Sequence, residues 1–276
     1  MALDINSNKY TIAFSTVMVV VVAVLLALAS EGLKPMQNAN IRVEKMQNIL
    51  SSVGLKTTAE QADSFYTAFI KESFVLDLEG NVKESPSQEA FDIDVLAQYK
   101  DKEKLDADKE YPLFVCEKDG KRSYIVPMVG TGLWGPIWGY MAISSDGITV
   151  EGASFDHKSE TPGLGAEINT SWFQAPFVGK KIFNDAGEFS PIKAVKGGAA
   201  DDDMHGVDAI SGGTITSNGL SAMISNTLKI YTKYFKELQA SSASVDISAL
   251  PLDSLAVDSL ALDSLTIDTL VSQPIK

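Results

Sequence analysis

Two threonine hydroxyls stand two residues apart at the predicted start of a long amphipathic helix. The stretch from Asp208 to Gly219 reads DAISGGTITSNG, so Thr214 and Thr216 directly follow a run of small residues. The first backbone N–H groups of a helix are unpaired and lie at the positive end of its dipole, and glycines let a phosphate approach them closely. One threonine could therefore cap the helix while the other carries a phosphate ester. Capping and turn formation alone also account for the pattern, because Ser, Thr and Gly are common in both.

Two earlier stretches also combine glycine with side chains that suit a cofactor site. Residues 157–165 read HKSETPGLG, which predicts a tight Pro-Gly turn after a strand. Residues 132–140 read GLWGPIWGY, in which Trp134 could pack in the core or form an aromatic wall beside a flat ligand. Taken singly, each stretch is explained by turn and core formation.

Residue counts narrow the chemistry that these stretches could perform. Cys116 is the single cysteine among 276 residues, which excludes an intramolecular disulfide and an iron–sulfur cluster held by this chain's thiolates. His157 and His205 lack the spacing of metal ligands, so we assign no metal site and no catalytic residue. The net charge of −13 argues against nucleic acid as a partner, because its phosphates attract basic surfaces. Any redox chemistry therefore requires an organic cofactor.

Together, the three stretches resemble motifs of the FMN-binding domain family. The segment SGGTIT at residues 211–216 is similar to the family's flavinylation motif S-G-A-T-x-T, with Gly213 where alanine is usual. Residues 157–165 match the family's H-x-x-E-T-P-G-L-G, and residues 132–139 resemble its G-L-W-x-x-x-x-G. Two such motifs in the right order, about 50 residues apart, are harder to explain by turn formation than either one alone.

This resemblance makes residues of all three stretches candidates for holding FMN. In the family the last motif threonine carries the flavin as a phosphoester, which implies covalent FMN on Thr216. Thr161 and Leu164 are implied to lie near the flavin ring, with Trp134 as the aromatic wall beside it. The other candidates lie in the two glycine-rich motifs and are Ser211, Gly212, Gly213, Thr214, Glu160, Gly163 and Gly165.

From its apolar N-terminal run to about Leu238, the chain is also similar to the C-subunit family of bacterial sodium-translocating NADH:quinone oxidoreductases. This similarity implies an electron-transfer subunit in a membrane complex that oxidises NADH, reduces ubiquinone and exports Na⁺, so that enzyme activity belongs to the complex. It also implies the other subunits as partners, and a flavin transferase that uses FAD and magnesium for maturation. Two alternatives stay open: the G-subunit of the related ion-translocating electron-transport complex, and a membrane-anchored binding module without a redox function.

The N-terminal region contains one apolar run of membrane-spanning length. Thr11–Ser30 reads TIAFSTVMVVVVAVLLALAS, about 20 residues without a charge, which suffices for a bilayer core of about 30 Å. A cleavable signal peptide, with Ala27–Ala29 resembling its cleavage site, is the alternative, although its apolar region is usually about 7–15 residues long. We expect an uncleaved single-pass anchor in contact with lipid of the bacterial inner membrane, with the globular domain on the periplasmic side.

The remaining patterns predict an α+β fold with a mostly antiparallel sheet and flanking helices. Asp119-Gly120 and Asp146-Gly147 each separate two apolar, alternating segments, which predicts two β-hairpins. Thr57 and Glu60 form a capping-box pattern that predicts the start of a short helix. The helix after Thr216 is predicted from an apolar stripe at Leu220, Met223, Ile224, Leu228, Tyr231, Phe235 and Leu238.

These patterns divide the chain into four parts. Residues 1–33 form the anchor, residues 34–110 a helical and loop part of the extracytoplasmic domain, and residues 111–240 the covalent FMN-binding domain. Residues 241–276 form a tail with the pentads PLDSL-AVDSL-ALDSL-TIDTL, whose period of five fits neither a helix nor a strand. We expect a flexible acidic tail, with a partner-binding strip as the alternative.

Overall fold

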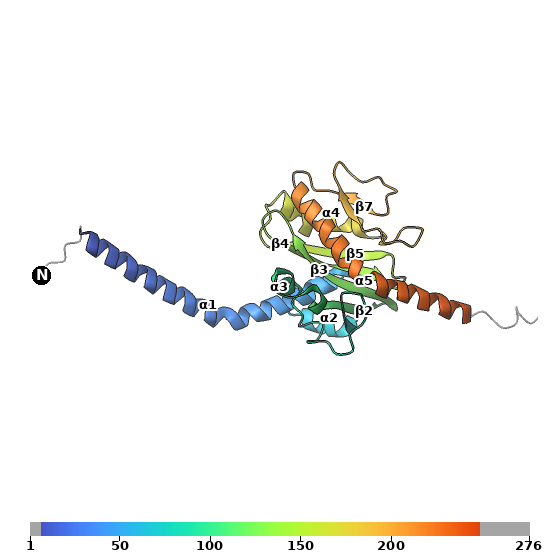
Figure 1. The fold of residues 1–276 in the computed structure, drawn as a ribbon, viewed down its shortest axis with the longest axis horizontal. Coiled ribbons are helices and arrows are strands. Elements are labelled where there is room, and N and C mark those ends of the chain that lie inside the picture. Colours follow the sequence, from blue (N-terminus) through green and yellow to red (C-terminus); the bar gives the residue numbers. More distant parts are fainter. Residues whose placement is uncertain (1–6, 249–276) are drawn as a thin grey trace, which may run out of the picture.

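The computed structural model describes residues 7–248, with side-chain environments up to residue 241. The helices are α1 (Asn8–Ser52), α2 (Ala62–Phe69), α3 (Val95–Lys100), α4 (Ser171–Gln174) and α5 (Thr214–Ser248), with 3₁₀ turns at Asp106–Asp108, Gly165–Asn169 and Ala175–Phe177. The strands are β1 (Ile70–Leu76), β2 (Tyr111–Lys118), β3 (Lys121–Thr131), β4 (Pro136–Ser144), β5 (Val150–His157), β6 (Lys193–Val195) and β7 (Gly206–Asp208). Figure 1 shows a central sheet with helices against it and α1 extending away from it, so the expected α+β class is confirmed.

The five-stranded sheet is an antiparallel meander in the order β1-β2-β3-β4-β5. Both predicted hairpins are present. Asp119 and Gly120 have φ values of 52° and 75°, as a two-residue hairpin turn between right-twisted strands requires. At the second hairpin the Asp146 carboxylate accepts hydrogen bonds from the backbone N–H groups of Ile148 and Thr149, which closes a longer loop. A separate parallel pair, β6 and β7, follows the sheet.

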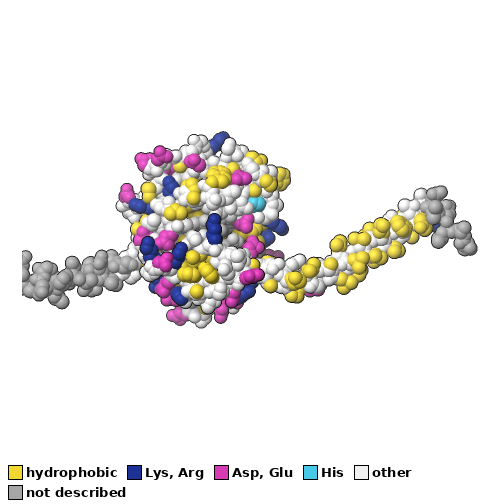
Figure 2. Space-filling view, turned by 180° about the vertical axis from the view of Figure 1, so that it is seen from behind, with side chains coloured by type: hydrophobic (Ala, Val, Ile, Leu, Met, Phe, Trp, Pro, Cys, Tyr) yellow, Lys and Arg dark blue, Asp and Glu magenta, His cyan; other side chains and the backbone are white. Residues whose placement is uncertain are grey.

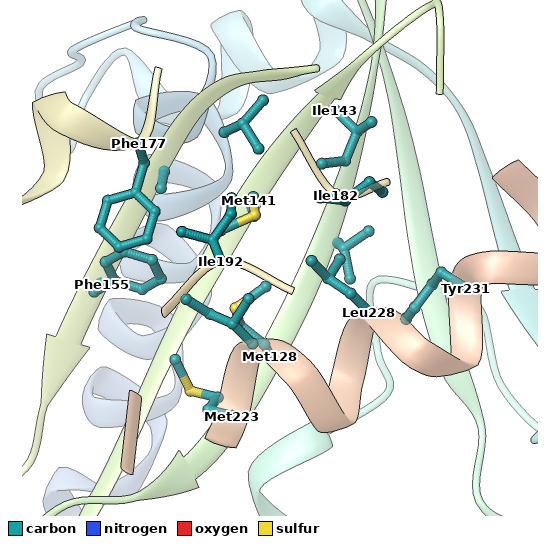
Figure 3. Packing of buried hydrophobic residues seen from close by; sticks show 14 of the residues in the cluster. Met128, Met141, Ile143, Phe155, Phe177, Ile182, Ile192, Met223, Leu228 and Tyr231 are labelled. Carbon is teal, nitrogen blue, oxygen red and sulfur yellow. The ribbon is translucent and has the colours of Figure 1, made fainter. Parts of the chain in front are cut away.

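The sheet is buried on both faces because successive residues of a strand point to opposite sides. In β2, Leu113 and Val115 enter the core beneath α5, whereas Phe114 and Cys116 enter a second core with Ile49 of α1. Figure 3 shows Met223, Leu228 and Tyr231 of α5 directed toward Met128 and Met141 of the sheet. The predicted stripe of α5 is confirmed, since six of its members are buried and Leu238 is partly buried.

Small residues let α5 approach the end of β3 very closely. A Cβ atom on Gly219 would lie 2.1 Å from the carbonyl oxygen of Thr131, and one on Gly130 would lie 2.7 Å from Cβ of Met223. Further along α5, the buried Tyr231 hydroxyl donates a 2.8 Å hydrogen bond to the carbonyl oxygen of Pro112. The helix is therefore fixed to the sheet at the start of its buried stripe and again within it, at Tyr231.

Helix α1 is one continuous helix from the apolar run to the sheet, and it crosses the boundary after residue 33 at which the sequence was divided into an anchor and a helical and loop part. Figure 1 shows the helix bending partway along, and Pro35, which removes a backbone donor, lies inside it. Gly54 ends the helix at a φ of 74°, with Leu55 N–H bonded to Leu50 O and Gly54 N–H to Ser51 O, the Schellman pattern.

The apolar half of α1 has the length and composition needed to cross a membrane. Among the helices of residues 7–248, α1 alone meets these two criteria. Its side chains are exposed, and Figure 2 shows an apolar rod leaving the globular part. One apolar N-terminal helix of this kind fits a membrane anchor.

The segment before β2 is more ordered than its polar composition suggested. The Glu110 carboxylate accepts hydrogen bonds from Lys83 Nζ at 2.7 Å, from Ser87 N–H at 2.8 Å and from the Ser87 hydroxyl. Burial alone would raise the pKa of Glu110, but these hydrogen bonds and the Lys83 charge lower it to about 2. Strand β1, from the same segment, pairs with β2, so residues 34–110 contribute to the central sheet.

Two helix boundaries differ from expectation. Helix α2 begins at Ala62 after a turn, so the capping box predicted at Thr57 and Glu60 is wrong; the Gln61 side chain instead accepts a 3.4 Å hydrogen bond from Thr58 N–H. Helix α5 continues to Ser248, so residues 241–248 are helical. The pentads of the predicted tail lie outside the described residues, and the four-part division of the chain stays a prediction.

Replacing Gly152 tests the contact that joins α1 to the sheet. A Cβ atom there would lie 2.3 Å from the carbonyl oxygen of Ser52. We expect Gly152→Ala to lower the free energy of unfolding of the full chain in detergent by about 1–3 kcal/mol. Gly32→Ala is the control, because nothing lies within 4 Å of that position and alanine favours a helix. Equal melting temperatures for the two variants would contradict this packing.

Candidate functional site

The hydroxyl of Thr216 lies inside the first turn of α5 and is buried. The helix begins at Thr214, and the carbonyl oxygen of Gly213 accepts the first helical hydrogen bond, from Ser217 N–H. Thr216 is 1% exposed, and its Oγ1 donates a 2.5 Å hydrogen bond to Oε2 of Glu160. Thr214 is exposed. The two threonine hydroxyls therefore differ in accessibility and in partner.

Glu160 joins the three sequence stretches. Its Oε1 accepts a 2.8 Å hydrogen bond from the backbone N–H of Trp134, while Oε2 accepts the Thr216 hydroxyl. The backbone N–H of Glu160 donates to Nδ1 of His157 at 3.2 Å. The antiparallel register places Ile137 opposite His157, so the turn before β4 and the turn after β5 meet at one end of the sheet. The carboxylate is thereby positioned by the sheet and not by its own turn alone.

Glycines make room for this carboxylate. A Cβ atom on Gly165 would lie 2.3 Å from Glu160 Oε2 and 2.5 Å from Thr216 Oγ1, and one on Gly132 would lie 2.6 Å from Glu160 Oε1. Gly132 was not among the predicted site residues, although it begins the GLW stretch. Real Cβ atoms do not approach so closely, so larger residues at either position would displace the carboxylate.

The two glycine-rich turns also contact each other. A Cβ atom on Gly212, whose φ is 76°, would lie 2.6 Å from Cδ2 of Leu164. A Cβ atom on Gly213, where the family usually has alanine, would lie 2.9 Å from Cγ2 of Ile210 and 3.4 Å from the backbone nitrogen of Gly165. An alanine at position 213 therefore requires Ile210 to shift by a few tenths of an ångström.

Several apolar side chains of the three stretches are exposed at the protein surface. The side chain of Trp134 is 65% exposed among the residues that the structure describes. The interpretation that this tryptophan packs in the core is therefore wrong. Leu164 is 41% and Ile215 58% exposed, and Leu133 beside Trp134 is also exposed. Of these, Leu133 and Ile215 were missed in the sequence, where single apolar residues next to glycines carry no distinctive signal.

The other predicted residues lie on the exposed turns around this centre, without a described contact to Thr216. Thr161 and Gly163 belong to the turn after Glu160, and the Gly163 N–H donates to Glu167 Oε1 at 3.0 Å. Ser211 lies on the exposed turn that leads into α5. The structure thus gathers every predicted stretch at one end of the sheet, with Glu160 and Thr216 at its centre.

The residues present suit a phosphate-linked flavin in their chemistry. Within the described residues, the backbone N–H groups of Thr214, Ile215 and Thr216 have no acceptor, which leaves donors for an anion at the positive end of α5. The exposed apolar side chains offer a surface for a planar ring. The hydroxyl itself is covered by Glu160 and Gly165, so a phosphoryl group can reach Oγ1 only after one of these contacts opens.

A cavity of about 310 Å³ lies elsewhere, between α3, the end of β3 and α5. Its lining includes Tyr99, Thr131, Gly219 and Asn226. Thr216, Glu160 and Gly165 are not among the residues that line this cavity. The cavity is therefore not the place where a group on Thr216 would begin.

Comparison with known proteins assigns this region to a class. Residues 132–229 match the FMN-binding domain family, a range that contains all three stretches and the first half of α5. The fold and the site therefore define an FMN-binding domain at the end of an apolar N-terminal helix.

Similar curated proteins identify the family more narrowly. The C-subunit of the Na(+)-translocating NADH-quinone reductase from Vibrio vulnificus (strain YJ016) is 31% identical over 226 residues, covering 78% of this chain and 88% of the relative. The C-subunit from Neisseria meningitidis (serogroup A, serotype 4A) is 32% identical over 261 residues, covering 84% and 96%. The chain belongs to the C-subunit family of the Na(+)-translocating NADH-quinone reductases.

Solved structures agree with this assignment. The crystal structure of the C-subunit from Parabacteroides distasonis ATCC 8503 gives a TM-score of 0.66 at 40% identity, covering 74% of this chain and 96% of that one. NqrC from Shewanella oneidensis gives a TM-score of 0.60 at 26% identity, covering 71% and 98%.

Gly165→Ala tests the central contact directly. Because the added methyl group would collide with both Glu160 Oε2 and Thr216 Oγ1, we expect the buried carboxylate to lose its hydroxyl partner. The cost is about 1–3 kcal/mol of unfolding free energy, measured on protein free of flavin. The control Thr161→Ala changes an exposed side chain on the same turn and should alter stability by less than about 0.5 kcal/mol. An unchanged Gly165→Ala variant would contradict the described geometry.

Proposed function

We propose that this chain is the FMN-carrying electron-transfer subunit of a Na(+)-translocating NADH-quinone reductase, with the FMN phosphate esterified to Thr216 Oγ1. The observation that supports the proposal is the junction of the three FMN-family stretches at one buried carboxylate, which is hydrogen-bonded to the Thr216 hydroxyl. Thr214, the other candidate acceptor, has an exposed side chain and no such partner in the described part of the chain.

Different residues around Thr216 would hold the phosphate and the ring of the cofactor. The unpaired N–H groups at the start of α5, with Ser211, Gly212 and Gly213 leading into it, would hold the phosphate. Leu164, Thr161, Gly163 and Gly165 form the turn beside it, and Trp134 would form the aromatic wall of the ring. Bound through its phosphate, FMN keeps an unmodified ring that accepts and donates electrons.

Oxidation of NADH, reduction of ubiquinone and export of Na⁺ are properties of the complex, of which this chain contributes one electron-transfer step. Its partners are the other subunits of the complex, consistent with relatives that are named as its C-subunit. Those names favour this function over the G-subunit of the related complex or a binding module without redox chemistry. Attachment of FMN would require a flavin transferase acting on the folded or folding chain.

For the membrane, we propose that residues 11–30 of α1 cross the bacterial inner membrane in contact with lipid and that the sheet domain lies on the periplasmic side. The support is the uncharged, exposed surface of this part of the helix and its continuity into the domain.

Orientation can be tested with cysteines, because the native Cys116 is fully buried and will not react. We expect Asp185→Cys, on an exposed loop, to react with a membrane-impermeant thiol reagent in intact spheroplasts. Asn8→Cys, at the other end of the anchor, should react only after the membrane is disrupted. The reverse labelling pattern would place the domain in the cytoplasm.

Thr216→Val tests the attachment. The variant keeps the shape of threonine but removes the hydroxyl, so we expect complete loss of flavin fluorescence from the denatured polypeptide. The lost hydrogen bond to Glu160 should also lower stability by about 1–3 kcal/mol, which a melting curve will report.

Thr214→Val is the matched control, two residues earlier and exposed, and should retain covalent FMN. Peptide mass mapping of wild-type protein from the native membrane locates the flavin directly. Flavin on Thr214, or on neither threonine, would overturn the assignment of Thr216.

A further inference from the structure

Glu160 is a buried carboxylate with an unusual set of partners. It is 5% exposed, and its oxygens accept one backbone N–H, from Trp134 at 2.8 Å, and one hydroxyl, from Thr216 at 2.5 Å. None of the ion pairs in the described part of the chain includes it. Buried carboxylates are usually paired with a cation, whereas the group that faces Oε2 of this one is a hydroxyl.

The hydrogen bonds that anchor Glu160 lie outside the Leu164–Gly165 segment that covers Thr216. Its carboxylate is held by Trp134 and its backbone N–H by His157, both at the end of the β4–β5 pair. The covering atoms belong to Gly165, beyond the exposed Gly163, whose φ is 74°. Displacement of the Leu164–Gly165 segment could therefore uncover Oγ1 while Glu160 keeps its place against the hydroxyl.

We infer that Glu160 is the general base for flavin attachment, so that this chain supplies part of the catalytic machinery for its own modification. The inference rests on the proposed phosphoester at Thr216. A threonine hydroxyl is a weak nucleophile at neutral pH and is activated by a base within hydrogen-bond reach, the relation that Thr216 Oγ1 and Glu160 Oε2 have here. His157, the nearest imidazole on this turn, has its Nδ1 directed to the Glu160 backbone instead.

The step is a phosphoryl transfer from a flavin dinucleotide such as FAD. Thr216 Oγ1 attacks the phosphorus of the FMN half, so that an O–P bond forms and the bond from this phosphorus to the bridging oxygen breaks. The adenylate leaves with that oxygen and the electron pair as AMP, and the hydroxyl proton passes to Glu160 Oε2. No atom changes its oxidation state.

The proton that Glu160 accepts can stabilise the modified site after the transfer. The ester oxygen on Thr216 has no hydrogen to donate, so an ionised Glu160 would then face an acceptor and a phosphate charge. A protonated Glu160 can donate to the ester oxygen instead, while its other oxygen keeps the Trp134 N–H. The same side chain thus accepts a hydrogen bond before modification and donates one after it.

The test uses the full-length chain, purified without flavin in detergent, with purified flavin transferase, FAD and Mg²⁺. Flavin on the Thr216 peptide is followed over time by mass spectrometry across a pH series. We expect the wild type to incorporate flavin more slowly at acid pH, and Glu160→Gln to slow incorporation by about 10²–10⁴-fold and to lose that dependence on pH. Glu167→Gln is the control; it alters a carboxylate that holds Gly163 N–H and Trp172 but does not touch Thr216, so incorporation should keep the wild-type dependence of rate on pH.

The outcomes separate this inference from the proposed function. Wild-type protein that takes no flavin at Thr216 would overturn the attachment and the inference with it. Two results would overturn the inference alone while wild-type protein takes flavin at Thr216. In the first, Glu160→Gln incorporates flavin as fast as the wild type; in the second, it incorporates flavin slowly but with the wild-type dependence of rate on pH. If Glu160→Gln fails to fold, Glu160→Asp decides, because a shorter carboxylate must keep the acid fall in rate if it acts as the base. A protonated-carboxyl infrared band in modified protein, absent from Glu160→Gln, supports the final state.

Discussion

The hydrogen bond between the Thr216 hydroxyl and the Glu160 carboxylate is the constraint on which the site depends. A carboxylate that is almost fully buried must be satisfied by nearby donors, and here those donors come from the start of α5 and from the turn that contains Trp134. Because the two donors belong to segments more than 80 residues apart in the sequence, the carboxylate fixes three separate turns relative to one another. Of these contacts, the Glu160 carboxylate is the one that touches all three turns at once.

The sheet makes this junction possible. Its antiparallel register brings the turn before β4 beside the turn after β5, and α5 crosses the same end because Gly130 and Gly219 let it approach β3 closely. The residues at the junction are small for the same reason, since a methyl group on Gly132 or Gly165 would occupy the space of the Glu160 carboxylate. The glycines of the motifs thus serve close packing as much as turn formation.

Helix α1 connects this domain to the proposed anchor as one continuous helix. The helix runs from the apolar segment to Ser52, whose carbonyl oxygen lies against Gly152 of β5, and β5 ends at His157 beside Glu160. The flavin site proposed here is therefore joined to the anchor by a helix and a strand, elements that keep their length. In a subunit that passes electrons to its neighbours in a complex, such a connection limits how far the cofactor can move from its partners.

The elements that depend on local chemistry could be predicted from the amino-acid sequence. Both hairpins follow from Asp-Gly turns, α5 from its apolar stripe and the anchor from an uncharged run, because each signal lies within one segment. The three motifs could be recognised by resemblance. The continuity of α1, the exposure of Trp134 and the reach of Glu160 to Thr216 across 56 residues of chain became visible only in the folded molecule. Contacts of that kind depend on strand register and helix docking, which no local pattern encodes.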